Sequence, residues 1–556
     1  MCVLMAVMEA AGVLSIMPFL SVLARPDLTR ENSLLRAVYH YFSFATPRDF
    51  ILALGCASIV VVIASSAFKT TTLHLVNRFV HLERTSISAR LLARYFAQPY
   101  EFFLTRNPAL LSKTLLSETD ELIGGLLLPL SQTIAQGVIL CAVIFLLLVY
   151  DPWMALCILF SVLALYSVVY RLARKRLEQI GREWQEANGR RYQLCNEALN
   201  SIKDVKITHS AAVYQRYFAD SAHQFSRHWA TSDTLNQSPL YFVEAAGYTG
   251  LILIALWLLL QTNDLAHVLP ALGLYGFAAY RMLPSAQIIY RGAARLKFSK
   301  AALGNICQDL RLSETQVSPL SAARLEPKRE IRLEGVCYAY PAAPNTPVFT
   351  RLDLRIQAKT CVGITGKSGT GKSTLLDILL GLLTPQAGGL FIDDMRIVPE
   401  NISAWQRVIG YVPQHIFLAD VSVAENIAFG VPRDHIDFEA VEKAARAAQI
   451  HDFIVARLPE KYATRIGNFG IRLSGGQRQR IGIARALYRD PSVLVMDEAT
   501  SALDTETEAA LTDAIGLLSG SRTILIVAHR EASLRHCQEI ITLQSDGTYT
   551  MTVLDA

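Results

Sequence analysis

Six long apolar stretches occupy the first half of the chain. They cover residues 3–23, 50–72, 123–150, 153–170, 241–261 and 268–290. Each is close to the roughly 20 residues that a helix needs to cross the hydrocarbon core of a bilayer. No basic segment precedes the first stretch, so we interpret it as a membrane helix rather than a cleavable signal peptide. The pattern predicts an all-helical membrane domain with six spans over residues 1–300.

The distribution of lysine and arginine predicts how these spans are oriented. Residues 73–122 contain 6 lysines and arginines in total and residues 171–240 contain 11, whereas residues 151–152 and 262–267 contain none. By the positive-inside rule, the two long basic segments are cytoplasmic. The chain therefore leaves the membrane domain on the cytoplasmic side, and we expect the rest of it to lie there.

Apolar residues recur at helical spacing within both basic segments, over residues 82–96 and 184–202. This spacing predicts that the spans continue as helices into the cytoplasm, with short turns near Pro99, Asn107 and residues 206–210. Solvated basic loops close to anionic headgroups would explain the charge but not the spacing.

The remaining pattern predicts three further segments. Residues 33–42 are amphipathic and predict either an interfacial helix on the outer surface or a plain connecting helix. Residues 301–328 are mixed and polar, and we interpret them as a linker. Over residues 329–556, short β-rich runs alternate with helical stretches, which is typical of an α/β domain. Its expected strands include residues 331–338, 361–365, 493–496 and 523–528.

Composition narrows the class of protein. Apolar residues make up 52% of the chain, more than a soluble protein of 556 residues needs for its core. The net charge of +5 is modest for this length and gives no reason to expect nucleic acid as a partner. The 9 cysteines are scattered without a C-x-x-C motif, which argues against a zinc site or a disulfide framework.

A glycine-rich loop between an expected strand and an expected helix fits the pattern G-x-x-x-x-G-K-[ST]. The strand is residues 361–365 and the helix is residues 374–383. Such a loop turns its backbone N–H groups toward phosphates, and the helix N-terminus favours the negative charge. Lys372 would neutralise the β- and γ-phosphates, and the Ser373 hydroxyl would ligate Mg²⁺. The candidate nucleotide-binding residues here are Gly366, Ser368, Gly369, Thr370, Gly371, Lys372, Ser373 and Thr374.

An acidic pair, Asp497 and Glu498, follows the apolar run 493–496. A buried strand that ends in a carboxylate is what a P-loop ATPase uses to hold Mg²⁺, here through Asp497. Glu498 would then polarise the attacking water as a general base. An acidic pair after a strand also commonly marks a helix N-terminus, so the pair alone does not decide between the two interpretations.

The run Leu473, Ser474, Gly475, Gly476 and Gln477 resembles the signature sequence of ABC transporters. The other motifs of that family lie around it in the expected order. Before the signature, Tyr340 matches the aromatic that stacks on adenine, with Tyr338 as a second candidate, and Gln414 matches the Q-loop and is also a candidate Mg²⁺ ligand. After the signature, Asp504 matches the D-loop and His529 matches the switch histidine. The six spans ahead of these motifs match the exporter arrangement. The resemblance implies a six-helix transmembrane domain, the linker 301–328 and an α/β P-loop nucleotide-binding domain over residues 329–556.

The resemblance also implies how the chain would work. In this family the signature turn, here Ser474, Gly475 and Gly476, binds the γ-phosphate of ATP held by a partner chain. A chain with one phosphate loop and one signature is therefore expected to form a twofold homodimer. ATP then drives a conformational change because it binds the closed state more tightly than the open one.

Short matches within the spans resemble the lipid-linked oligosaccharide flippases of bacterial protein glycosylation, the PglK type. They lie at residues 8–19, 242–244 and 280–286. The resemblance implies flipping of a lipid-linked saccharide across the bacterial cytoplasmic membrane. A multidrug, lipid or peptide exporter of the same architecture is the first alternative, and an ATP-gated channel or regulator is the second.

Three ionisable residues, Glu9, Glu244 and Arg281, fall within the predicted spans. A charge at membrane depth is costly unless it is paired or faces water, so each is a candidate for a substrate cavity. Arg281 would meet the phosphates of a lipid-linked saccharide, and Arg291 is a second candidate nearer the cytoplasm. A structural ion pair of Arg281 with a carboxylate that holds the helices together is the alternative.

Overall fold

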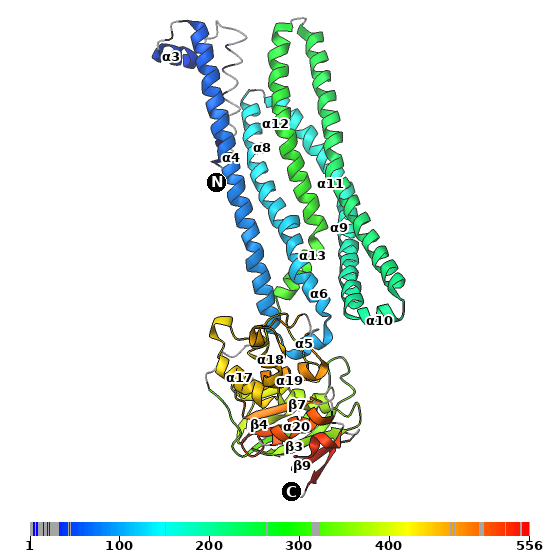
Figure 1. The fold of residues 1–556 in the computed structure, drawn as a ribbon. Coiled ribbons are helices and arrows are strands. Elements are labelled where there is room, and N and C mark those ends of the chain that lie inside the picture. The colour runs from blue at the N-terminus through cyan, green and yellow to red at the C-terminus, as the bar shows by residue number, and fades with distance from the viewer. Residues whose placement is uncertain are drawn as a thin grey trace. The chain divides into compact units, whose positions relative to one another are not determined.

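The computed structural model describes residues 33–42, 46–150, 152–262, 265–312, 323–467, 473–499, 505–516, 518–528, 530–544 and 547–554, with a few isolated positions elsewhere. The chain divides into two compact units. The first is Met1–Phe96 with Arg106–Ser313, and the second is Ala97–Thr105 with Glu314–Ala556. Figure 1 shows that the first unit is built of long helices and that the second combines strands with helices.

Long helices form the first unit. They are α4 (Pro47–Phe96), α8 (Leu128–Tyr150), α9 (Pro152–Asn200), α11 (Ala211–Thr262) and α12 (Leu265–Phe298). Shorter elements complete it: α3 (Ser33–Tyr41), α6 (Pro108–Lys113), η1 (Thr114–Glu118), α7 (Thr119–Leu122), η2 (Ile123–Leu127), α10 (Ile202–Ile207) and α13 (Lys300–Leu310). Helix α12 packs against α8 and α11, and α11 packs against α9 (Figure 1).

Five of the six predicted spans lie in these helices, and the first, 3–23, lies almost wholly outside the described residues. In the described part of the chain, the helices Arg48–Phe96 and Pro108–Phe145 are long and apolar enough to cross a membrane. The helix expected over residues 33–42 is confirmed as α3. The first third of the expected linker 301–328 is helical, because α13 extends to Leu310.

The predicted helical extensions of the spans are confirmed, since α4 runs to Phe96 and α9 runs to Asn200. Their cytoplasmic location stays a prediction. The predicted turns near Pro99, Asn107 and residues 206–210 are confirmed, and short helices that the sequence analysis did not predict lie between or beside them. Helix α5 (Tyr100–Thr105) lies between Pro99 and Asn107, and α10 follows α9. Proline ends a helix but is well suited to begin one, so two breaks six or more residues apart leave room for a helical turn between them.

A proline within α11, Pro239, interrupts the backbone hydrogen bonds of that helix. Because Pro239 has no N–H group, the carbonyl of Leu235 loses its helical donor. The Tyr290 hydroxyl of α12 donates to that carbonyl at 3.0 Å, and Gln287 Nε2 of α12 donates to the carbonyl of Asn236 at 3.2 Å. Side chains of α12 therefore satisfy the broken stretch of α11 and hold the two helices together there.

Two sheets form the second unit. The antiparallel sheet has the order β2-β1-β4-β5, from β1 (Glu330–Tyr338), β2 (Phe349–Gln357), β4 (Ala387–Ile392) and β5 (Met395–Arg396). The larger sheet has the order β10-β9-β3-β8-β7-β6, from β3 (Cys361–Gly366), β6 (Ile409–Val412), β7 (Val493–Asp497), β8 (Thr523–Val527), β9 (Glu539–Leu543) and β10 (Tyr549–Val553). From β9 to β6 the strands of the larger sheet are parallel. Strands β7 and β8 are buried almost throughout, as their continuous apolar runs require.

Helices cover the strands of this unit. They are α14 (Lys372–Leu379), α15 (Ile402–Gln406), α16 (Val423–Ile427), α17 (Phe438–Ala447), α18 (His451–Arg457), α19 (Gly475–Leu487) and α20 (Thr505–Gly516). The expected bounds of the helix after the glycine-rich loop, 374–383, are wrong at both ends. It begins at Lys372 and ends at Leu379, because Gly381 adopts a left-handed conformation with φ of 68° and the Leu382 N–H bonds back to the Asp377 carbonyl.

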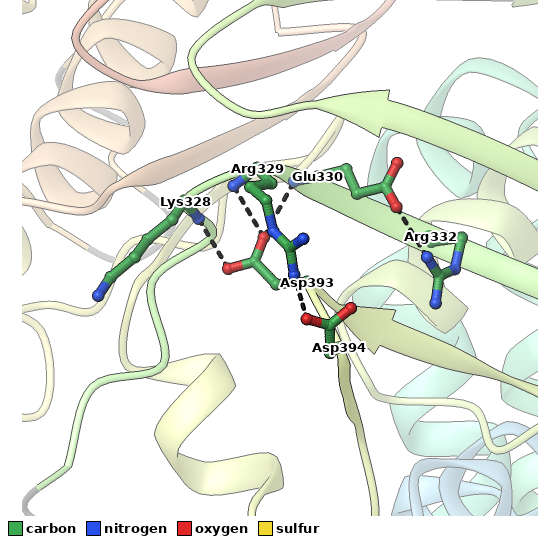
Figure 2. Close-up of polar contacts among 6 residues, drawn as sticks. All are labelled: Lys328, Arg329, Glu330, Arg332, Asp393 and Asp394. Carbon is green, nitrogen blue, oxygen red and sulfur yellow. Dashed lines mark hydrogen bonds and ion pairs between the residues drawn. The ribbon is translucent and has the colours of Figure 1, made fainter.

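A single carboxylate anchors the end of the linker to the antiparallel sheet. Figure 2 shows Asp393, in the turn between β4 and β5, accepting the backbone N–H groups of Lys328, Arg329 and Glu330 at 3.1, 2.8 and 3.0 Å. Arg329 also forms an ion pair with Asp394. Burial alone would raise the pKa of Asp393, but the three N–H bonds outweigh it and lower that pKa. The chain thus enters β1 in a defined position.

Candidate functional site

The topology of the larger sheet brings three motifs to one edge. Strands β3, β8, β7 and β6 are parallel neighbours, so their carboxyl ends lie side by side. Gly366, Val527, Asp497 and Val412 end these four strands. In open α/β sheets, ligands bind outside the carboxyl ends of the strands. The glycine-rich loop, the acidic pair and the segment that carries Gln414 therefore face the same region.

The glycine-rich loop connects Gly366 at the end of β3 to Lys372 at the start of α14. Gly371 caps the helix with φ of 94°, and a Cβ atom there would lie 2.7 Å from Val348 Cγ1, so only glycine fits. The Lys372 ammonium donates to the carbonyls of Gly366 and Lys367 at 2.8 and 3.0 Å. The Lys372 side chain thus lies against the loop that is predicted to bind a phosphate.

The acidic pair lies at the end of β7, the strand between β8 and β6. Glu498 has φ of 48°, in the left-handed region that non-glycine residues rarely adopt, and its N–H bonds to the Val527 carbonyl at 2.9 Å. Gln414 Nε2 donates to Glu498 Oε2 at 2.7 Å, which brings the two predicted residues together. Strained backbone of this kind is concentrated at functional sites.

Burial and the neighbouring Glu498 charge raise the pKa of Asp497, whereas Lys372 lowers it. Asp377, on α14, joins this cluster and was not predicted from the sequence. Burial and the charge of Asp497 raise the pKa of Asp377 to about 6. An acid within the apolar run 375–379 was the signal that would have revealed it. Asp377, Asp497 and Glu498 therefore form a cluster of interacting carboxylates.

Asp377 gives a pH dependence. Because its pKa in the folded protein, about 6, exceeds the roughly 3.9 of an unfolded aspartate, its contribution to stability is present below about pH 4 and is lost as pH rises through about 6. We expect Asp377→Asn to stabilise the nucleotide-free protein by about 1–2 kcal/mol at neutral pH, a value reduced for partial exposure. Thermal unfolding of the full-length protein at about pH 5 and 7.5 measures this, with the exposed Asp434→Asn as the control. An equal gain at both pH values would contradict it.

The predicted signature residues begin a helix, as expected. Helix α19 starts at Gly475 with Ser474 as its N-cap. The Ser474 hydroxyl accepts the Gln477 N–H at 3.2 Å, and Gln477 Oε1 accepts the Ser474 N–H at 2.8 Å. This reciprocal capping box fixes the turn and aims the first helical N–H groups outward. Farther along α19, Gln479 donates to the Glu498 carbonyl at 3.4 Å, a link that the sequence did not reveal.

The structure distinguishes the two candidate adenine-stacking tyrosines. Tyr338 is only 1% exposed, and its hydroxyl donates to Glu101 Oε1 of α5 at 2.8 Å. Tyr340 is half-buried and packs edge-on against Tyr338, with ring centroids 5.2 Å apart. Its hydroxyl lies 3.0 Å from the Thr374 hydroxyl at the start of α14. Tyr340 is therefore the tyrosine that is exposed enough, and close enough to the glycine-rich loop, to stack on a base bound there.

We expect Tyr340→Ala to weaken ATP binding about 3- to 10-fold, which corresponds to the loss of one aromatic stacking contact. Tyr340→Phe should bind ATP as the wild type does. Tyr338→Phe is the matched control, because it keeps the buried ring and removes only the bond to Glu101. Equilibrium binding of a fluorescent ATP analogue to the full-length protein measures the effect. Equal affinity in Tyr340→Ala and the wild type would place the base elsewhere.

Several predicted residues cannot be placed. Asp504, His529 and Glu9 lie outside the described residues, and Arg281 lies in α12 with its side chain outside them. Glu244 is half-buried in α11 and does not line the cavity described next. Their roles stay predictions.

The first unit holds a cavity of about 600 Å³ between α4, η2, α8, α11 and α12. Its lining includes Arg291, the second candidate from the sequence, together with Lys69 and Arg295, which were not predicted. Lys69 falls near the end of the predicted span 50–72, and an ionisable residue inside an apolar span was the signal overlooked there.

The residues at the sheet edge fit a magnesium nucleotide. The outward-facing N–H groups of the loop suit phosphates, and the crowded carboxylates with raised pKa values suit a cation. In the described part of the chain, no group of three or more His, Cys, Asp or Glu side chains could hold a metal by itself. Mg²⁺ is commonly bound through one or two protein ligands together with substrate phosphates. A site of that kind therefore does not need three such side chains.

Comparison with known proteins decides the family. Residues 349–501 match the ABC transporter domain family, and residues 34–264 match the ABC transporter transmembrane region. The ATP-dependent lipid A-core flippase of Chromohalobacter salexigens is 30% identical over 458 residues, which cover 80% of this chain and 76% of that protein. The chain belongs to the ABC transporters. It is a half-transporter of the exporter type that binds and hydrolyses ATP.

Other relatives agree with this assignment. The lipid A-core flippase of Cupriavidus pinatubonensis is 28% identical over 81% of this chain and 76% of its own length. The mouse ATP-binding cassette sub-family B member 5 is 41% identical over 39% of this chain, a region that covers 17% of that longer protein. Among solved structures, a bacterial Atm1-family ABC exporter with ATP bound has a TM-score of 0.78 at 20% identity, and the match covers 97% of this ABC transporter and 93% of that chain. The predicted fold class is therefore confirmed.

Proposed function

We propose that two copies of this ABC transporter hydrolyse Mg-ATP at two shared sites and thereby flip a lipid-linked saccharide across the bacterial cytoplasmic membrane. The observation that supports this most directly is the cavity among the membrane helices, whose lining includes amide and cationic side chains, in a chain whose other unit gathers the ATPase residues at one sheet edge. The nucleotide-binding unit would lie in the cytoplasm, because the basic segments of the membrane unit are expected there.

In this proposal, each residue at the sheet edge has one task in hydrolysis. Lys372 and the loop N–H groups from Gly366 to Ser373 hold the phosphates, and Tyr340 stacks on the base. Ser373, Gln414 and Asp497 would hold Mg²⁺, which neutralises charge on the transferred phosphoryl group. Glu498, oriented by Gln414, accepts the proton of the attacking water. His529 is proposed to position the γ-phosphate from the end of β8.

The second half of each site would come from the partner subunit. Ser474 and the N–H groups of Gly475 and Gly476 open a capped helix, and such a helix N-terminus can bind a phosphate. A twofold arrangement lets each signature turn, together with Gln477 and the predicted D-loop residue Asp504, complete the site of the neighbouring subunit. ATP then favours the closed dimer, and hydrolysis releases it.

The substrate class follows from the cavity and from the relatives. Amide side chains such as Gln132, Gln136 and Asn236 line the cavity beside the apolar Leu73 and Val76. Hydrogen-bonding groups suit a saccharide, and an apolar wall suits a hydrocarbon chain. Two relatives are named for flipping lipid A-core, which supports a lipid substrate with a large polar head.

Reconstituted proteoliposomes test the proposal. We expect ATP-dependent transfer of a fluorescent polyprenyl-linked saccharide from the leaflet on the nucleotide-binding side to the other, and no transfer with a non-hydrolysable analogue. Export of a hydrophobic dye or a peptide without transfer of the lipid would instead assign a multidrug or peptide exporter. Ion conductance gated by ATP without any transport would assign a channel.

A further inference from the structure

The chain passes between its two units at three points. Residues 97–105 leave the first unit and rejoin it, and the chain leaves it again after Ser313. Tyr95, Arg106 and Asp309 lie close to these points in the sequence, one at each, and all three belong to the first unit. Any displacement that travels along the backbone between the units therefore passes one of these residues.

A single buried carboxylate joins the three residues. Asp309, near the end of α13, is only 6% exposed. Its Oδ2 atom accepts the hydroxyl of Tyr95, in the last turn of α4, at 2.6 Å, and its Oδ1 atom accepts Arg106 Nη1 at 3.3 Å. These three residues form the Asp309 junction. A buried charge is costly unless it is paired and hydrogen-bonded, so the carboxylate favours the arrangement in which both partners are in place.

Helix α13 also packs against its neighbours through other contacts. Ile306 is buried in a cluster with Leu91 of α4 and Leu122 of α7. One turn before Asp309, Asn305 Nδ2 donates to Glu118 Oε1 of η1 at 3.3 Å. Replacing a buried ion pair by apolar side chains is often neutral or stabilising, so packing alone gives no reason for a carboxylate in the junction. Buried ionic groups can instead fix one register between packed helices.

The two segments that run from the Asp309 junction into the second unit are both anchored there. Glu101 of α5 accepts the Tyr338 hydroxyl of β1 at 2.8 Å, and Tyr338 packs against Tyr340, the proposed adenine-stacking residue. The far end of the linker is held to the same antiparallel sheet by the three N–H bonds to Asp393 (Figure 2). A displacement of this sheet on ATP binding would therefore be passed to α5 and to the linker together.

We propose that Asp309 is a positioning residue that couples ATP binding to the membrane helices, because the Asp309 junction makes the ends of α4 and α13 and the segment after α5 move as one body. Energetic coupling between distant sites can be carried by packed helices and hydrogen-bond networks of this kind. Loss of the junction leaves the ATPase residues in place, since they all belong to the second unit. It separates hydrolysis from transport. The inference rests on the ATP-driven transport in the proposed function and not on the identity of the substrate.

The amount of lipid transferred per ATP in proteoliposomes tests the inference. We expect Asp309→Asn to hydrolyse ATP within about twofold of the wild-type rate and to transfer at least about fivefold less lipid per ATP, because coupling between sites is typically worth at least that factor. Arg106→Gln should show the same separation, and Arg106→Lys, which keeps the charge, should restore part of the transfer. Asp120→Asn is the matched control, because its carboxylate pairs with Arg84 at 3.0 Å but is exposed and adjoins none of the three points.

Hydrogen exchange tests the same coupling without any substrate. Amide exchange of the full-length protein is measured by mass spectrometry with and without a non-hydrolysable ATP analogue. We expect the analogue to slow exchange at residues 366–373 in every variant, and to change exchange in α4 and α12 of the wild type but not of Asp309→Asn. A substitution that only loosened the fold would raise exchange equally with and without the analogue. The analogue-induced difference therefore reports coupling and not stability.

An unchanged analogue-induced difference in Asp309→Asn, or an equal loss in Asp120→Asn, would overturn the inference. If Asp309→Asn does not fold, Arg106→Gln decides, because the Arg106 side chain is 38% exposed and its loss spares the core. A wild type that transfers no lipid-linked saccharide but shows the analogue-induced difference would refute only the proposed function. Lipid transfer per ATP at the wild-type level in Asp309→Asn would refute only the role of Asp309.

Discussion

Glu498→Gln lowers the ATP turnover of the full-length protein by about 100-fold or more while it leaves ATP binding intact. General base catalysis typically contributes about 10² to 10⁴ to a rate, and glutamine cannot accept the proton of the attacking water. The amide oxygen of glutamine can still accept the bond from Gln414 that Glu498 accepts at 2.7 Å, so the geometry should persist. Steady-state phosphate release and ATP retention after gel filtration measure the two effects.

The control is Glu439→Gln, a loss of the same charge on the exposed face of α17. We expect it to hydrolyse ATP at the wild-type rate. Unchanged turnover in Glu498→Gln would assign the base to another residue. Loss of ATP binding together with turnover would show instead that the substitution had damaged the site.

A dimer with Lys372→Ala in one subunit and Ser474→Arg in the other recovers hydrolysis that neither mutant homodimer has. If each site combines the phosphate loop of one subunit with the signature turn of its partner, both lesions of the mixed dimer fall in one site and the second site is intact. Each homodimer carries a lesion in both sites. We expect turnover at least about tenfold above either homodimer and at most about half of the wild-type rate.

Two affinity tags, one on each subunit type, allow the mixed dimer to be purified after co-expression. A mixed dimer of wild-type and Lys372→Ala subunits is the control for the cost of losing one site. Hydrolysis as low as in the mutant homodimers would show that the loop and the signature act within one chain. That result would remove the dimer from the proposed mechanism.

Much of the fold follows from local pattern. The apolar runs predict helices because a backbone in lipid must satisfy its own hydrogen bonds, and α4, α8, α9, α11 and α12 contain those runs. The strands before the glycine-rich loop and the acidic pair lie where their apolar runs predict, at β3 and β7. The exact end of α14 was missed because Gly381 stops that helix before the predicted residue 383.

The sequence also contains the chemistry of the nucleotide site, since the loop, acidic pair and signature are each short contiguous motifs. The positions of these motifs relative to one another, in contrast, depend on the tertiary structure. Gln414 and Glu498 are 84 residues apart and meet only because β6 and β7 pair in parallel. The environment of Asp377 likewise depends on Asp497, which a distant strand brings near α14.

The sequence by itself determined the family, the helical membrane unit and the residues able to handle a nucleotide, because these depend on periodicity and on contiguous motifs. Only the tertiary structure decided which tyrosine is available to a base and where the cationic cavity lies. Tyr338 and Tyr340 have the same local pattern but differ in burial once α5 contacts β1. The cavity draws Lys69, Asn236 and Arg295 from three helices, and such a convergence depends on packing between helices that no local pattern records.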